Sequence, residues 1–211
     1  MTDKKDITKS PENNVRISSS IIKGQRLDSS TVKFFNKNLS YNSQGNNIYV
    51  LCDTSRSMRG NRIARLKETV EKLFNRPNLS FVEFGVDPIR RIESAKNITT
   101  QANTLMWAGL NFCYKNLANR IVLLTDGCPT DARAEQILER VSTSFTHIPI
   151  DTIGIGGDEK SWGYDADFLR TLAQITGGTF CEVKDFELNK LLATTEKLLQ
   201  IGYTNKGVIT L

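Results

Sequence analysis

Three oxygen-bearing side chains follow an apolar run in a pattern that suits cation binding. Asp53, Ser55 and Ser57 occupy alternate positions directly after Ile48–Cys52. A continuous apolar run of this length predicts a β-strand that is covered on both faces, as in a parallel sheet. Helical spacing of apolar residues resumes at Ile63. The three side chains are therefore expected where the carboxyl end of a strand turns into a helix, which is where open α/β sheets bind ligands.

Hard divalent cations such as Mg²⁺ take oxygen ligands, and several of these are often supplied by water or by a bound partner. One carboxylate and two hydroxyls provide about half of such a shell. Two candidates for the other half occur later in the chain: Asp126 ends the apolar run Ile121–Thr125, and Thr104 opens a segment with helical apolar spacing. Carboxylates that converge from two buried strands repel each other unless a cation or proton intervenes. We therefore favour a metal site.

Simpler roles exist for these residues. Asp53 is a suitable helix N-cap, because Asp side chains accept hydrogen bonds from free backbone N–H groups. One N-cap does not explain two carboxylates at two strand ends. The glycines Gly154, Gly156 and Gly157 do not complete a G-x-G-x-x-G fingerprint before a helix, so we expect a tight turn there.

Catalytic alternatives have weaker support. A hydrolase could use Asp53 as a nucleophile, but Ser55 stands where the D-x-D-x-T phosphatase pattern has its second Asp. No P-loop pattern is present. The single histidine, His147, lies before a predicted strand, and Cys128 has no histidine partner nearby in the sequence. We predict that the protein is not an enzyme.

Strands and helices alternate along the rest of the chain. Their lengths predict a doubly wound α/β fold, with a mostly parallel sheet, helices on both faces and one antiparallel edge strand. After the first strand, the expected strands are 79–84, 89–92, 121–126, 148–155 and 179–183. The expected helices are 61–75, a segment after Thr104, 132–145, 168–175 and a closing amphipathic helix from Phe186 to Ile201.

Length and composition suit one domain with extensions. Of the 211 residues, we expect 1–14 to be a disordered tail, 15–46 a polar extension, 47–204 the folded domain and 205–211 a second tail. The net charge of +5 is scattered, which indicates a solvated surface and not a nucleic-acid interface. Four cysteines without C-x-x-C spacing are expected to be reduced and mostly buried. With no apolar stretch for a signal peptide or membrane span, a cytoplasmic location is expected.

The ordered site residues resemble a known family. Domains of the von Willebrand factor type A (VWA) family carry a metal-ion-dependent adhesion site that reads D-x-S-x-S, then a Thr, then an Asp. The matching residues are Asp53, Ser55, Ser57, Thr104 and Asp126. The resemblance covers about residues 47 to 204 and implies the Rossmann-like VWA fold. It also implies a bound Mg²⁺ or Mn²⁺ with these five residues around it.

The resemblance also implies a function. In the family, residues matching Ser55, Ser57 and often Thr104 contact the metal, and those matching Asp53 and Asp126 commonly act through water. A Glu or Asp of a partner protein fills the remaining position. Residues 124–131, L-T-D-G-C-P-T-D, look like the corresponding segment of stand-alone bacterial VWA proteins of the tellurite-resistance (TerY-like) and stress-response type. We therefore expect a metal-dependent protein interaction module.

Two points remain open at this stage. Arg56 stands between the two serines, where many family members have Gly, and it either contacts the acidic partner or points into solvent. The alternative function is a non-catalytic accessory subunit of an AAA+ ATPase or of a phosphatase or kinase complex, as some family members are.

Overall fold

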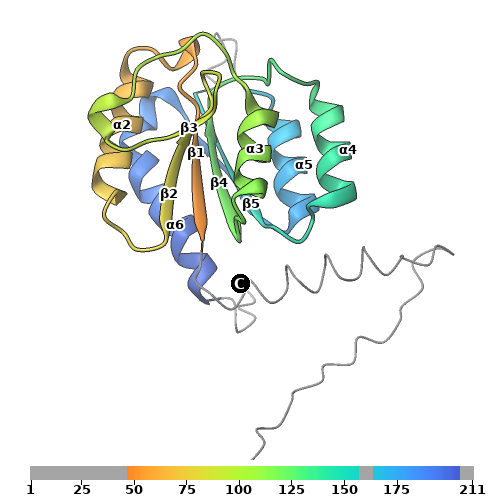
Figure 1. The fold of residues 1–211 in the computed structure, drawn as a ribbon. Helices are drawn as coiled ribbons and strands as arrows, with labels where there is room; N and C mark the ends of the chain where they lie inside the picture. Colours follow the sequence, from red (N-terminus) through yellow and green to blue (C-terminus); the bar gives the residue numbers. More distant parts are fainter. Residues whose placement is uncertain (1–46, 157–163, 205–211) are drawn as a thin grey trace, which may run out of the picture. The chain divides into compact units, whose positions relative to one another are not determined.

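One mixed sheet forms the centre of the domain. The computed structural model describes residues 47–156 and 164–204, and its ribbon is drawn in Figure 1. The predicted tail 1–14, the predicted polar extension 15–46 and the predicted tail 205–211 lie outside these residues. The strands are β1 (Ile48–Cys52), β2 (Leu79–Glu83), β3 (Arg90–Arg91), β4 (Arg120–Thr125), β5 (Ile150–Ile155) and β6 (Phe180–Val183).

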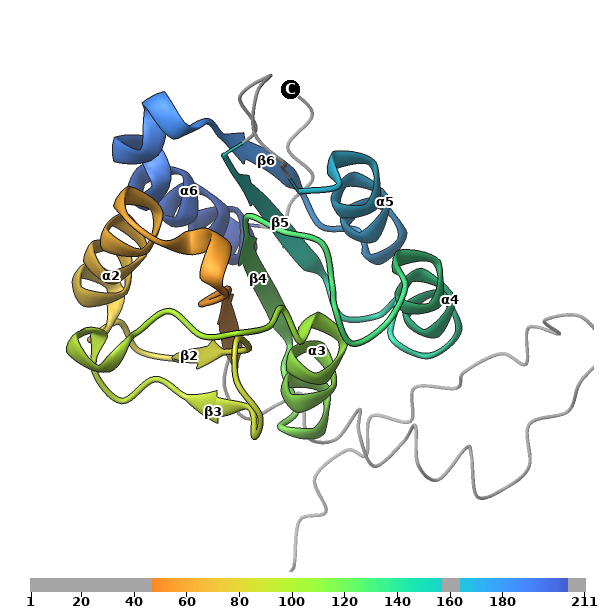
Figure 2. The same ribbon diagram turned by 90° about the horizontal axis from the view of Figure 1, so that it is seen from above.

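The strand order is β3-β2-β1-β4-β5-β6. All neighbouring pairs are parallel except β2 and β3, which are antiparallel. The predicted fold class is therefore confirmed, including its antiparallel edge strand. Because the chain passes from β1 to one side of the sheet and later returns to the other side at β4, the order reverses between these two strands. Figure 2 shows this arrangement from above.

Helices cover both faces of the sheet (Figure 1). The α-helices are α2 (Asn61–Leu73), α3 (Met106–Lys115), α4 (Ala134–Ser144), α5 (Ala166–Thr176) and α6 (Leu191–Thr204). Short 3₁₀ segments are η1 (Arg56–Met58), η2 (Ala95–Asn97) and η3 (Asp185–Lys190). Among the described helices, none is long and apolar enough to cross a membrane.

Two apolar cores explain why β1 reads as an unbroken apolar run. Val50 and Cys52 pack into the core beneath α2 and α6, whereas Tyr49 and Leu51 pack into the core beneath α3, α4 and α5. All five residues of β1 are buried. Side chains alternate between the two faces of a strand, so in a central strand that is covered twice apolar residues can follow one another without alternating with polar ones.

The closing helix differs from its prediction. The segment expected as one helix from Phe186 is divided into η3 and α6. Phe186 is 78% exposed, whereas Leu191 and Leu198 are buried. The carboxylate of Asp185 is bound by Arg62 of α2, which fixes the first turn before the amphipathic α6 begins. This contact between distant segments has no signature in the local apolar spacing.

The cysteines are free, as predicted. Cys52 and Cys113 are buried, Cys181 is half-buried and Cys128 is exposed. The expectation that most are buried therefore holds for only two of the four. Cys128 is exposed because it follows the end of β4, on the loop at the edge of the sheet.

Candidate metal-binding site

The two strand-end carboxylates lie at the reversal point of the sheet. β1 and β4 are parallel neighbours, with Cys52 in register with Leu124. The backbone N–H of Asp53 donates to the carbonyl of Leu124 at 2.9 Å, so the hydrogen-bonded ladder continues to the first residue of the loop. Asp126 follows the last residue of β4. The topology thus brings residues 73 positions apart to one edge of the sheet, as the sequence predicted.

Ser55, Ser57 and Asp126 form one hydrogen-bonded chain. The Oγ atoms of Ser55 and Ser57 are 2.8 Å apart. Ser57 Oγ donates to Asp126 Oδ1 at 2.7 Å. Ser55 and Asp126 are buried, and the exposed Ser57 links them at the surface. Three of the five predicted ligands therefore contact one another directly.

Asp53 is completely buried and accepts two hydrogen bonds. Its Oδ1 accepts from the backbone N–H of Ser55 at 2.8 Å, and its Oδ2 accepts from Thr125 Oγ1 at 2.6 Å. The bond to the N–H two residues later is an Asx-turn and not a helix N-cap, because Ser55 precedes η1 and Gly60 precedes α2. Thr125 was not predicted as part of the site, although it directly precedes Asp126 in the sequence. It links the two strand-end loops.

Thr104 lies at the same site from a third segment. A Cβ atom placed on Gly127 would be 3.7 Å from both Ser57 Oγ and Thr104 Oγ1. Both hydroxyls therefore lie close to Gly127, on the side where a side chain would project, and the missing side chain leaves room beside them. Thr104 is 5% exposed. All five predicted residues thus gather at the carboxyl end of β1 and β4.

The loop after β4 fixes the position of Thr104. The backbone N–H of Thr104 donates to Thr130 Oγ1 at 3.1 Å, and its carbonyl accepts from the Thr130 N–H at 2.9 Å. Asp131 accepts hydrogen bonds from the N–H groups of Trp107 and Ala108, at 3.2 and 2.8 Å. These N–H groups lie in the first turn of α3, where no helical partner exists for them. The Thr-Asp pair after Pro129 therefore has a structural role.

Arg62 is a site residue that the sequence analysis missed. Its Nη1 donates to Asp126 Oδ2 at 2.7 Å, and its Nε and Nη2 donate to the two carboxylate oxygens of Asp185 at 2.7 and 2.5 Å. Its side chain is 13% exposed. Its position in the sequence could have indicated this role, because Arg62 is the second residue of the helix that follows the serine loop. Asp185 is 123 residues away in the sequence.

Gly156 makes room for the Arg62 guanidinium. It follows β5 with a φ of +95°, and a Cβ atom there would be 2.5 Å from Arg62 Nη2. The glycine cluster was interpreted from sequence as a tight turn. The positive φ agrees with that interpretation, and the close approach of Arg62 is a second reason for glycine.

Burial raises the pKa of both strand-end carboxylates. Burial, and then the charge of Asp126, raise the pKa of Asp53 to about 6, against the hydrogen bonds from Thr125 and Ser55. Burial also raises the pKa of Asp126, although the bonds from Arg62 and Ser57 oppose that shift. Hydrogen bonding to Arg62 lowers the pKa of Asp185. An additional positive charge at this edge would favour the ionised form of Asp53.

The donor set fits a hard divalent cation. It consists of carboxylate and hydroxyl oxygens, and the missing side chain of Gly127 leaves room beside two of the hydroxyls. Within residues 47–156 and 164–204, no group of three or more His, Cys, Asp or Glu is placed to hold a metal. A cation at this edge would therefore depend on serine and threonine hydroxyls and on water. Arg62 is the feature that such a donor set does not require.

The other sequence candidates lie outside this network. Arg56 is exposed, and its side chain forms no hydrogen bond or ion pair with any described residue, although its carbonyl accepts from the Arg59 N–H. His147 and Cys128 are both exposed and lie on different loops. The histidine precedes β5, at the opposite end of the sheet from the residue after β4. No described contact joins them.

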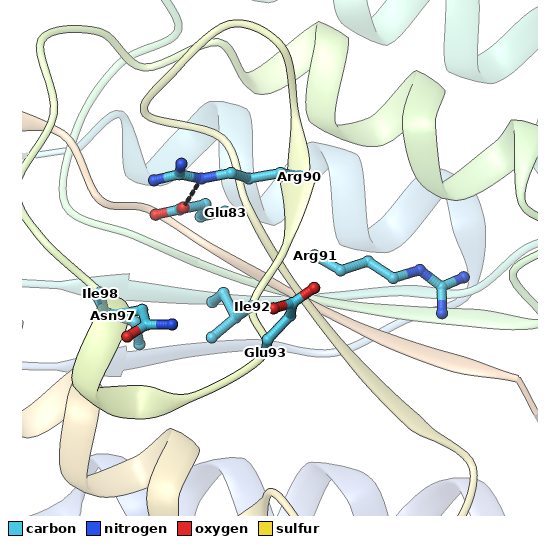
Figure 3. A pocket seen from close by; sticks show the side chains of 7 residues that line it. All are labelled: Glu83, Arg90, Arg91, Ile92, Glu93, Asn97 and Ile98. Atoms are coloured by element: carbon cyan, nitrogen blue, oxygen red, sulfur yellow. Dashed lines mark hydrogen bonds and ion pairs between the residues drawn. The ribbon is translucent and has the colours of Figure 1, made fainter.

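A separate pocket of about 480 Å³ lies beside the edge strand β3 (Figure 3). Its lining includes the Glu83 carboxylate, which is bonded to Arg90 through Oε1, and the apolar side chains Ile92 and Ile98. Glu83 Oε2 is buried and has no hydrogen-bond partner among the described residues. None of the five predicted site residues lines this pocket.

Comparison with known proteins agrees with the architecture. The family model for the von Willebrand factor type A domain matches residues 99–181, which include Thr104 and Asp126 but not the loop after β1. No curated protein matches the chain. A structure of a von Willebrand factor type A protein from Catenulispora acidiphila is similar, with a TM-score of 0.58 and 18% identity. It is matched over 71% of this chain and 41% of that one.

A second similar structure is proximal thread matrix protein 1 from the mussel byssus. Its TM-score is 0.50 at 18% identity, with 74% of this chain and 45% of that chain covered. The chain therefore matches less than half of the length of either structure. The family model, the strand order and the reversal point between β1 and β4 point to the same architecture, and the described domain has the von Willebrand factor type A fold.

Proposed function

We propose that this domain binds a divalent cation, Mg²⁺ or Mn²⁺, and through it an acidic group of a partner protein. Domains of this family commonly bind proteins. The observation that carries the proposal is the continuous chain Ser55–Ser57–Asp126 beside the buried Asp53. Two carboxylates and three hydroxyls from three segments converge there, which is more than the capping of one loop requires.

Ser55, Ser57 and Thr104 would hold the cation, with Asp53 and Asp126 as the charged groups behind them. When bound, the cation supplies a positive charge and a free coordination position that a carboxylate can take. The protein residues hold this arrangement rigidly, since Asp53 is fixed by Thr125 and Ser55, and Thr104 is fixed by Thr130. A rigid first set of ligands reduces the entropy lost on binding.

The geometry favours binding over catalysis. Asp53 would be the nucleophile of a hydrolase, but it is completely buried and both of its carboxylate oxygens accept hydrogen bonds. A carboxylate that attacks a substrate needs an approach path to one free oxygen. We therefore propose a non-enzymatic role. The accessory-subunit role beside an ATPase, phosphatase or kinase uses the same surface and is the second candidate.

The cellular setting is also part of the proposal. The L-T-D-G-C-P-T-D segment at residues 124–131 resembles bacterial proteins of the tellurite-resistance and stress-response type, which suggests a cytoplasmic protein of such a system. The structure adds a reason for this segment, because its Thr130 and Asp131 hold Thr104 and the start of α3.

Metal titration tests the proposal directly. We expect Mn²⁺ to bind the full chain with one site by calorimetry, and Ser57→Ala to weaken binding at least about ten-fold because it removes the central hydroxyl, a loss of about 1.4 kcal/mol. Ser142→Ala, at an exposed serine of α4, is the matched control and should bind like the parent. Equal Mn²⁺ binding by the parent and Ser57→Ala would contradict the proposed site.

A second measurement tests the partner. The immobilised chain is incubated with candidate partner proteins in Mg²⁺ and, in parallel, in a chelator. We expect capture only in Mg²⁺, and loss of capture when the partner's acidic residue is changed to its amide. Capture that is equally strong in chelator would show that the partner uses a different surface.

A further inference from the structure

Arg62 places a fixed positive charge inside the proposed metal site. Its guanidinium donates to Oδ2 of Asp126, while Ser57 donates to Oδ1 of the same carboxylate. The Asp126 side chain is completely buried. Both oxygens of the carboxylate behind the site are therefore engaged, one by a hydroxyl and one by a cation.

We propose that Arg62 is a tethered counter-cation that neutralises Asp126 in the metal-free domain and sets the affinity of the site for divalent cations. This inference rests on the proposed function. It adds that Arg62 of α2 lowers the affinity for divalent cations, and that Asp185 of η3, its second partner, partly offsets this effect. The site would then load at a higher cation concentration than the same ligands would without Arg62.

The local packing supports a built arrangement and not an incidental surface pair. Arg62 is 13% exposed, its three bonding nitrogens are all used, and Gly156 leaves the space its guanidinium occupies. Arg65, one turn later on the same helix, is more exposed and has a more exposed partner. It pairs with Glu68 at side-chain exposures of 46% and 45%, where ion pairs contribute little.

Removal of the Arg62 charge and removal of the Asp185 charge should change the metal affinity in opposite directions. A divalent cation near Asp126 is repelled by the Arg62 guanidinium, so removal of that charge should tighten metal binding. Asp185 offsets part of the same positive charge, so its removal should weaken metal binding. Removal of both changes the local charge by zero and should restore an affinity close to that of the parent.

A purely structural role of Arg62 would give a different pattern of melting temperatures and Mn²⁺ affinities. If Arg62 only fastened α2 to η3, then Arg62→Gln and Asp185→Asn would each lower the melting temperature of the metal-free domain. Their Mn²⁺ affinities would both stay the same or both fall. Opposite shifts in affinity are expected only if Arg62 acts on the metal through its charge.

The experiment measures Mn²⁺ dissociation constants by calorimetry and by the loss of the free-Mn²⁺ electron paramagnetic resonance signal. It uses the full chain as parent, Arg62→Gln, Asp185→Asn, the double variant, and Arg65→Gln as the matched control. We expect Arg62→Gln to bind Mn²⁺ about ten-fold more tightly and Asp185→Asn about three- to ten-fold more weakly. The double variant and Arg65→Gln should lie within about three-fold of the parent. Circular dichroism checks that each variant folds.

The possible failures are distinguishable. If the parent, Arg62→Gln and Arg65→Gln all bind Mn²⁺ with the same dissociation constant, this inference is overturned and the proposed function is unaffected. No binding by the parent and by Arg62→Gln overturns the proposed function, and this inference with it. Binding by Arg62→Gln alone supports the inference in its strongest form. If Arg62→Gln does not fold, Asp185→Asn provides the test. Weaker Mn²⁺ binding by Asp185→Asn supports the inference, and unchanged or tighter binding contradicts it.

Discussion

Arg62 Nη1 lies 2.7 Å from Asp126 Oδ2, so the carboxylate at the end of β4 already has a cationic partner before any metal is added. The carboxylate at the end of β1 has none among the described residues. Asp53 accepts only a backbone N–H and a hydroxyl. The two strand ends thus differ electrostatically: burial raises the pKa of both carboxylates, and only Asp126 has an arginine that opposes the shift.

Asp53→Asn should stabilise the metal-free domain near neutral pH. The pKa of Asp53 is raised to about 6 in the folded protein, whereas an unfolded Asp titrates near 3.9. In the folded state Asp53 therefore keeps its proton up to a higher pH than in the unfolded state. The parent loses stability as pH rises from about 4 to about 6. The amide can accept from the Ser55 N–H and donate to Thr125 Oγ1. The gain should be absent at pH 4 and reach up to about 3 kcal/mol above pH 6.

Urea unfolding in chelator at pH 4, 5, 6 and 7 measures this difference. Asp167→Asn is a suitable control, because that side chain is 93% exposed on α5. A stability gain that is the same at every pH would mean that the ionisation of Asp53 is not its source.

Gly156→Ala should destabilise the domain and release Arg62. The positive φ of Gly156 strains a side-chain-bearing residue, and the added Cβ displaces the guanidinium from its position. We expect a loss of about 2–4 kcal/mol in the free energy of unfolding. Gly177→Ala separates the two causes, because Gly177 also has a positive φ but has no atom within 4 Å of the new Cβ. That control should lose only about 1–2 kcal/mol. Equal losses would indicate that contact with Arg62 contributes nothing.

Asp131→Ala should loosen the start of α3 and, through it, the position of Thr104. It removes two hydrogen bonds to helix N–H groups, and loss of such a cap typically costs about 1 kcal/mol. We expect a decrease of this size in thermal unfolding experiments, together with a Mn²⁺ affinity that falls a few-fold. A variant with reduced stability but unchanged Mn²⁺ affinity would show that Thr104 holds its place without this support.

Arg56→Gly should separate partner binding from metal binding. Arg56 is exposed and its side chain has no described partner, so its removal should change stability by no more than about 0.5 kcal/mol and Mn²⁺ affinity by no more than a few-fold. A guanidinium beside the metal can add a charge-assisted bond to an acidic partner group, so partner affinity should fall about ten-fold or more. Arg59→Gly, at the exposed residue after η1, provides the comparison in the same loop. Unchanged partner affinity in Arg56→Gly would place its side chain outside the interface.

Much of the fold and part of the site could be predicted from the sequence alone. The apolar runs Ile48–Cys52 in β1 and Ile121–Leu124 in β4 determined two buried parallel strands, because a strand covered on both faces buries its side chains at successive positions. The polar residues directly after them determined where a site could form. Asp53, Ser55 and Ser57 needed no long-range information, since their spacing along one loop was sufficient.

Only the tertiary structure decided how that site is charged. Arg62 meets Asp126 across 64 residues and Asp185 across 123, and no periodicity or local motif records either contact. They exist because β1 lies beside β4, and because η3 brings Asp185 to the start of α2. Charge interactions depend on distance in space, and distance between segments is set by strand order and helix packing. For that reason the sequence determined which oxygen atoms are present at the site, and the fold determined which cation is already there.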